Sequence, residues 1–415
     1  MKYYLGKQQT GFSLIEIMIA LALSAGLLTG IVQVFTGSRT NYQLDNAVSE
    51  TQESGNFALE QLADTLRYRG FQGCAGSHTN NKATLYKPIS SDFIIRDLWK
   101  ESLLGYEVNS SSNLSITPSL NDVLDTTGST FRDKLVVGTA AILSNPTPAP
   151  NSDIVSIYHG SLAVASVNGN MANKTAPLSV DARTGNNTIT NWTAGEPVIV
   201  GNCSTTALFT ISAFTNSPAT GAPTSYLLEH TKDDQPDPTK AKNTTDDLPI
   251  FALPTPSAPS AVRRAWVDVF YVADTGRRST AQGRPSIFGL FLSRNGGSPV
   301  EVTSGIEYMG IQYGEVFDDG KKIQYLNAHE VTDFRSVQSV RIGVLAVSDE
   351  PVLKTPDIRT YSLPGLDIAS TANPQNSGTG ISTSITYDAS DLRLRKTFVT
   401  TVYLKNAVDY TTSGS

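Results

Sequence analysis

Cysteine, histidine and charge are all scarce in this chain. Its 415 residues include two cysteines and four histidines, and 17% are charged, against about 25% in an average soluble domain. The histidines are His78, His159, His230 and His329. None of their spacings is typical of a metal site, so we expect neither a metal nor a cofactor. The net charge of −6 argues against electrostatic binding of nucleic acid by the chain as a whole.

Motifs that mark catalytic sites are missing as well. "GEVFDDGKK" differs from a phosphate-binding loop, because five residues separate Gly314 from Gly320 and Lys322 stands where Ser or Thr would bind magnesium. No G-x-S-x-G or H-E-x-x-H pattern occurs, and scattered Ser, His and Asp residues define no triad. We therefore expect that the chain is not an enzyme. Of the three functional hypotheses considered for this chain, a membrane-anchored periplasmic enzyme ranks third.

One long apolar run is present, from Phe12 to Phe35. Its roughly 24 residues are enough helix to cross a hydrocarbon core of about 30 Å. Before it, the short leader Met1–Gly11 carries Lys2 and Lys7, which by the positive-inside rule keeps this end in the cytoplasm. The sequence thus predicts a single-pass inner-membrane protein with the rest of the chain on the periplasmic side.

Glu16 is the only formal charge in that run. An acid at the bilayer centre costs at least ~2.5 kcal/mol, so Glu16 needs a partner unless it lies by chance near the membrane surface. Ala22, Gly26 and Gly30 recur every four residues, a spacing that favours helix packing in lipid over plain lipid exposure. The apolar run continues past "SAGLLTG", which argues against ordinary signal-peptide cleavage.

The segment "TGFSLIEIMIA" resembles the class III signal of type IV pilins and pseudopilins. The resemblance implies that prepilin peptidase cuts between Gly11 and Phe12, that Phe12 becomes the N-methylated terminus, and that Glu16 is the acid of the family. Phe12 and Glu16 are spaced i, i+4 and share one face of the helix. In the family, the acid meets the amine of a neighbouring subunit, so the cost of burying the charge is offset only on assembly.

Helical periodicity continues beyond the membrane span. The positions that form an apolar stripe are Leu44, Val48, Gly55, Leu59, Leu62 and Leu66. We expect the helix to end near Arg69 with Gly70 as its cap. This long helix under a head is the α+β architecture of a type IV pilin, with a large antiparallel β-rich head. The expected domains are a leader (1–11), a transmembrane half (12–35), an amphipathic periplasmic half (36–70), a β-rich region with an insertion (71–262) and a sheet core (263–415).

The two cysteines, Cys74 and Cys203, form an even pair on the oxidising side of the membrane. We expect a disulfide that closes a loop of about 130 residues and adds several kcal/mol of stability. The alternative is two buried thiols.

The region between about residues 80 and 260 is rich in Ser, Thr, Asn and Pro. "SDFIIRDLWKESLL" favours a short helix, whereas "SDIVSIYHG", "EPVIVGN" and "TALFTISAF" favour strands. The aspartates Asp233, Asp234 and Asp237 lack the spacing of an EF-hand, which favours a solvated loop over a calcium site. Beyond residue 263, "AWVDVFYVAD" with "SIFGLFLS" and "IEYMGIQYGEVF" with "KKIQYL" predict two hairpins.

"RGFQGCAG", "GIEYMGIQYG", "VQSVRIGVLAVS" and "LRLRKTFVTTVYLKN" are similar to segments of PilW-type minor pilins. This resemblance implies a subunit that primes, and is incorporated near the tip of, a type IV pilus. Its partners would be other minor pilins, the major pilin, prepilin peptidase, the inner-membrane assembly platform and a tip adhesin, with no specific nucleic acid. The alternatives are a J-type minor pseudopilin of type II secretion and a tip adhesin formed by the enlarged head.

Overall fold

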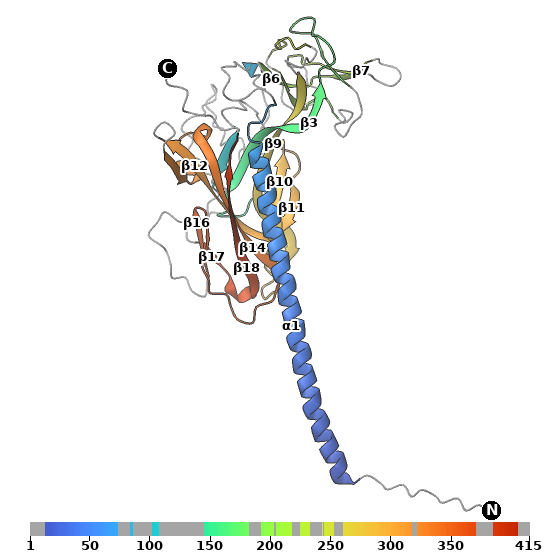
Figure 1. Ribbon diagram of the computed structural model, residues 1–415, viewed down its shortest axis with the longest axis vertical. Coiled ribbons are helices and arrows are strands. Elements are labelled where there is room, and N and C mark those ends of the chain that lie inside the picture. Colours follow the sequence, from blue (N-terminus) through green and yellow to red (C-terminus); the bar gives the residue numbers. More distant parts are fainter. Residues whose placement is uncertain are drawn as a thin grey trace, which may run out of the picture.

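A single helix, α1 (Leu14–Arg67), projects from a β-rich head (Figure 1). The structure is a computed structural model that describes residues 13–73, 84–85, 102–107, 145–181, 192–202, 205–217, 225–232, 243, 245–252, 260–317, 322–370 and 385–405. At 1.5 Å per residue the 54 residues of α1 are about 80 Å long. Every residue from Ser13 to Arg39 is exposed, and Ala47 is the first buried position. The predicted α+β layout of a pilin, with a long apolar N-terminal helix and an antiparallel head, is confirmed.

The larger of the two main sheets has eight strands among the described residues. Its order is β1 (Thr84–Leu85), β6 (Thr206–Thr210), β5 (Pro197–Gly201), β9 (Ala261–Arg278), β10 (Ser286–Arg294) and β11 (Val300–Ser304), while β2 (Leu103–Tyr106) pairs with β3 (Ile154–Ser166) and β3 with β9. Apart from the parallel β1–β6 pair, these ladders are antiparallel. The predicted β9–β10 hairpin is confirmed. The helix expected over "SDFIIRDLWKESLL" is wrong at its end, where Leu103 and Leu104 pair with β3.

The second main sheet has four strands in the part of the chain that the structure describes. Its order is β13 (Lys322–Leu326), β12 (Ile306–Phe317), β14 (Val337–Pro351) and β18 (Arg393–Tyr403), all antiparallel. The predicted β12–β13 hairpin is therefore confirmed. Short 3-10 turns flank these strands: η2 (Ala328–Glu330), η3 (Phe334–Ser336) and η4 (Ala389–Asp391).

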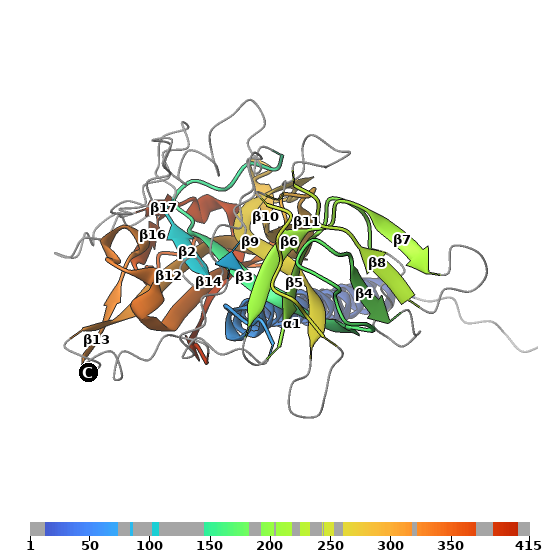
Figure 2. The same ribbon diagram turned by 90° about the horizontal axis from the view of Figure 1, so that it is seen from above.

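Two small sheets complete the described head. One contains β15 (Tyr361–Leu363), β16 (Leu366–Ser370) and β17 (Ile385–Tyr387), and the other β4 (Leu178–Asp181), β8 (Ser225–Leu228) and β7 (Phe214–Ser217). The β4–β8–β7 sheet shares a separate apolar core with residues of β5 and β6. We call this part the apical lobe, because it lies at the end of the head away from the start of α1 (Figures 1 and 2).

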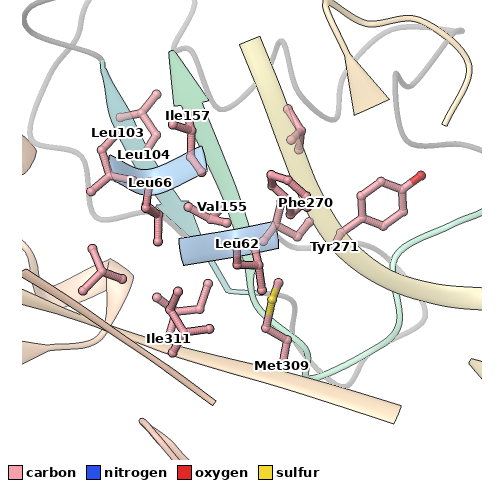
Figure 3. Packing of buried hydrophobic residues seen from close by; sticks show 14 of the residues in the cluster. Leu62, Leu66, Leu103, Leu104, Val155, Ile157, Phe270, Tyr271, Met309 and Ile311 are labelled. Atoms are coloured by element: carbon pink, nitrogen blue, oxygen red, sulfur yellow. The ribbon is translucent and has the colours of Figure 1, made fainter. Parts of the chain in front are cut away.

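The main core forms where α1 packs between the two large sheets. Figure 3 shows Leu62 and Leu66 of the helix between Val155 and Phe270 of one sheet and Ile311 of the other. Leu62 and Leu66 are fully buried. Burying a leucine side chain contributes about 1.5–3 kcal/mol, so this face of the helix fixes both sheets.

The last turn of the helix differs from the expected one. α1 ends at Arg67, and the N–H groups of Tyr68 and Arg69 then bond to the carbonyls of Thr65 and Leu66 in a tightened turn. This turn directs Arg69 into the head. Gly70 follows with a φ of +64° and donates its N–H to the carbonyl of Tyr158, 2.7 Å away.

Gly55 is a close-contact position in α1. A Cβ atom there would overlap the ring of Phe398 in β18, whereas Gly37 has no neighbour within 4 Å of such an atom. Glycine at 55 therefore lets the helix and β18 approach each other, although glycine lowers helix propensity by about 1 kcal/mol relative to alanine.

Gly55→Ala should destabilise the head despite the better helix propensity of alanine. We expect a net loss of about 1–3 kcal/mol, the usual cost of overpacking, in thermal or denaturant unfolding of the full chain in detergent. Gly37→Ala, the same change in the same helix, is the matched control and should not lower the melting temperature. An increase in melting temperature for Gly55→Ala would contradict this account of the contact.

Candidate assembly site

Glu16 begins α1 as part of a capping box. The side chain of Ser13 accepts the N–H of Glu16 at 3.2 Å, and Oε2 of Glu16 accepts the N–H of Ser13 at 3.0 Å. The carboxylate thus satisfies a backbone donor that the helix cannot pair by itself. In the isolated chain Glu16 is exposed.

The capping box was missed in the sequence analysis, although its signal was present. "SLIE" has the Ser-x-x-Glu spacing of a capping box immediately before an apolar run. The predicted cleavage residues Gly11 and Phe12 lie outside the described residues. Ala22, Gly26 and Gly30 lie within the exposed part of α1, and the two glycines have no neighbour within 4 Å of a built Cβ atom.

Membrane insertion is supported by the length and composition of α1. The helix contains an apolar stretch long enough to cross a bilayer, and none of that stretch is buried inside the head. Leu14, Leu23 and Val34 are each more than 70% exposed. Such a surface needs lipid or other helices around it.

Polar clusters in the head are engaged in structural contacts. Both ring nitrogens of His159 face acceptors, with Nε2 3.2 Å from the carboxylate of Asp268 and Nδ1 3.1 Å from the carbonyl of Gly160. Arg294 donates two hydrogen bonds of 2.7 Å to Asp268. Burial opposes ionisation of Asp268, but the hydrogen bonds from Arg294 and His159 lower its pKa overall. His159 is therefore held as a structural group.

A second cluster joins β18 to β12. Arg395 is 1% exposed and donates to Glu307 at 2.7 Å and to Asp391 at 2.6 Å. Burial favours the neutral acid, yet the hydrogen bonds and charge of Arg395 lower the pKa of Asp391. Among the described residues, no group of three or more His, Cys, Asp or Glu side chains could hold a metal ion.

Ser152 and Asp153 connect the two main sheets. The N–H of Asp153 donates to the carbonyl of Met309 at 2.9 Å, and the N–H of Met309 donates to Oγ of Ser152 at 3.0 Å. The carboxylate of Asp153 accepts the N–H of Ile311 at 2.6 Å. Burial first, and then the charge of Glu107, raise the pKa of Asp153 well above its ordinary value, although the bond from Ile311 opposes them.

Asp153→Asn should make the head more stable at neutral pH. Because the pKa of Asp153 is raised in the folded state, the contribution of this carboxyl group to folding stability is greatest below its unfolded-state pKa of about 3.9. That contribution is lost as pH rises through the folded-state pKa. Asparagine keeps an acceptor for Ile311 and has no charge, so melting temperatures should diverge in favour of the variant from pH 4 to pH 8.

Asp153→Ala is the control for the hydrogen bond. It removes the acceptor together with the charge, so it should be less stable than Asp153→Asn by about 1–3 kcal/mol at both pH values. If Asp153→Asn lost as much stability at pH 8 as Asp153→Ala, the carboxylate would be needed in its charged form and the assignment would be wrong.

The residues that flank the two cysteines approach the start of β9. Cys74 and Cys203 themselves lie outside the described residues. A Cβ atom at Gly73 would lie 3.4 Å from Nε of Arg263, and Arg263 pairs with Ile199 of β5. Because β5 continues to Gly201 opposite Ala261, both flanks border the same end of β9. The disulfide remains a prediction that this arrangement favours.

Peptide mapping of the full chain without reductant should recover a peptide pair that links Cys74 to Cys203. Reduction should then lower the free energy of unfolding by several kcal/mol, about 4–5 in the chain-entropy model for a loop of this length. Two thiols that react freely with an alkylating agent in the native, unreduced protein would refute the disulfide.

A long apolar N-terminal helix with an acid in its first turn, under a β-rich head, is the layout of a type IV pilin-like protein. Residues 6–32 match the family model of the prokaryotic N-terminal methylation motif, and residues 269–406 match that of the type IV pilus-assembly protein W. Over these residues the resemblance to PilW-type minor pilins is confirmed. Comparison with curated proteins and with solved structures gives no match.

The matches support a protein associated with the type IV pilus and anchored in a membrane through its N-terminal helix. Pilin domains are structural, and partners among pilins and the assembly machinery follow from this context. The match at residues 269–406 includes most of β9 and every strand after it.

Proposed function

We propose that this chain is a minor pilin that primes assembly of a type IV pilus and is incorporated near its tip. The observation that carries the proposal is Glu16, the single acid in the exposed apolar half of α1, within the residues that match the methylation motif. A carboxylate in lipid is stabilised when a cationic partner is available. Prepilin peptidase would supply one by cutting between Gly11 and Phe12.

The capping box suggests how Glu16 is tolerated before assembly. While the helix is in the membrane, the N–H of Ser13 offers the carboxylate one hydrogen bond, which reduces the cost of burying it. The N-methylated amine of Phe12 would lie one residue before Ser13. In the fibre, Glu16 then pairs with the amine of a neighbouring subunit, and Ala22, Gly26 and Gly30 allow the helices to approach closely.

The apical lobe supports a position near the tip. We assign it to the insertion within residues 71–262, before the sheet core of residues 263–415. Its separate apolar core includes Trp192, Phe209 and Phe251. The lobe lies at the end of the head away from the membrane anchor (Figure 1). In a fibre whose subunits share one helix direction, that end faces the distal tip, so a lobe there is best accommodated by a terminal subunit.

Partners and location follow from this role. They are other minor pilins, the major pilin, prepilin peptidase, the inner-membrane assembly platform and a tip adhesin. The head is periplasmic before assembly and at the cell surface afterwards. The competing assignments are a J-type minor pseudopilin of type II secretion and an adhesin that binds through the apical lobe. A strain that lacks the chain separates the J-type pseudopilin from the proposal. Loss of pili with intact secretion would support the minor pilin.

Glu16→Ala should leave membrane insertion and cleavage intact but abolish incorporation. Removing the charge makes the helix easier to insert, and only the contact between subunits is lost. We expect processed protein at wild-type levels in membranes and at least tenfold less in sheared fibres, measured by quantitative immunoblotting.

Gly11→Val is the control for processing, since it should leave the leader attached in mass spectra of the membrane fraction. Wild-type recovery of Glu16→Ala in fibres, with normal piliation, would show that Glu16 is no assembly contact. An unmodified Met1 terminus in functional fibres would refute the cleavage assignment itself.

A further inference from the structure

Among the described residues, β18 is an edge strand with no strand on its outer side. On its inner side it pairs with β14 from Arg393 to Tyr403. On its outer side, no other described segment makes a backbone hydrogen bond to residues 396–403. At about 3.4 Å per residue this open edge is about 27 Å long. Val399 is 52% and Tyr403 70% exposed along it.

The edge strands β11 and β13 of the large sheets carry the usual protection against pairing. β11 has five residues, carries Glu301 at its second position and faces a register shift in β10. β13 also has five residues and begins with Lys322. Short length, charge and irregularity are the features by which natural proteins protect sheet edges.

β18 lacks this protection over most of its length. Its charges are confined to the first four positions, and the remaining seven residues, "TFVTTVY", contain no charge, proline or glycine. Such a β-branched and aromatic segment at an open edge pairs readily with other chains. A periplasmic protein that keeps it needs a partner strand to cover it.

The direction of β18 limits what that partner can be. β14 begins beside Arg69 at the end of α1, and its final residues contact Glu50, lower in the helix. β18 is antiparallel to β14, so it runs in the same direction as α1, away from the membrane. Antiparallel pairing of two β18 strands would turn the two α1 helices in opposite directions, which a shared membrane forbids.

We propose that the outer edge of β18, from Lys396 to Tyr403, receives a strand of a neighbouring pilin-type subunit by β-strand addition. The incoming strand runs toward the membrane, antiparallel to β18, and extends the four-stranded sheet. Main-chain hydrogen bonds supply the affinity, and Val399, Thr401 and Tyr403 contact alternate side chains of the partner. The contact is head-to-tail, as repeated addition to a fibre requires. This inference rests on the proposed function only in taking the neighbour to be a pilin-type subunit.

The test combines an edge charge with a photo-crosslink in piliated cells. Thr401→Lys places a cation on the open edge, while Thr386→Lys makes the same change at an exposed residue of β17 and serves as the matched control. A benzophenone amino acid at position 399 reports the neighbour, which mass spectrometry identifies. Melting temperature in detergent and cleavage of the leader show that each variant folds and is processed.

We expect the crosslink to join position 399 to a strand of another pilin-type subunit. Thr401→Lys should lower its yield at least tenfold, and Thr386→Lys should not change it. A crosslink to this chain's own residues, to β18 of a second copy or to no protein would overturn the inference, as would an unchanged yield with Thr401→Lys. Crosslinking is scored in membranes and fibres separately. Absence of the wild-type chain from fibres would therefore refute the proposed function while the membrane crosslink still decides the β18 contact.

Discussion

The guanidinium of Arg69 lies at the point where the helix and both sheets meet. Its side chain is 2% exposed and donates to Oγ of Ser102 at 2.8 Å, before β2, and to the carbonyls of Phe334 and Val337 at 2.7 Å, where β14 begins. A buried cation is tolerated only when its donors are paired in good geometry. Arg69 therefore fixes the end of α1 relative to both sheets, and the leucines below it can pack only in that position.

Close approach of the layers depends on residues without side chains. Gly310 of β12 and Gly343 of β14 face each other in the ladder, and Cβ atoms there would overlap Pro364 in the turn between β15 and β16. The small β15–β17 sheet can therefore lie flat on the outer face of the four-stranded sheet. Gly55 has the same role between α1 and β18, so glycine sets the spacing on both faces of this sheet.

The arrangement separates a rigid scaffold from the parts available to partners. Charged groups that cluster near the core of the head, such as Arg395 and Glu307, are paired with one another. The carboxylate of Asp153 links the two sheets by accepting a hydrogen bond from the backbone N–H of Ile311. The exposed features lie at the periphery. These are the apolar half of α1, the apical lobe and the edge of β18. A structural subunit needs this division, because its contacts with neighbours must not distort the core that positions them.

The exposed apolar half of α1, the α+β class and the two hairpins were all predictable from the sequence, because each follows from local periodicity or from spacing within a few residues. The capping box of Ser13 and Glu16 was local too and could have been found. Tertiary structure alone decided that Leu103 and Leu104 form a strand, since their pairing with β3 outweighs the helical preference of the segment. It also decided the burial of Arg69, the hydrogen bond from Ile311 to Asp153 and the open edge of β18. Each of these depends on segments tens to hundreds of residues apart, and no pattern within one segment specifies which distant backbone group it will meet.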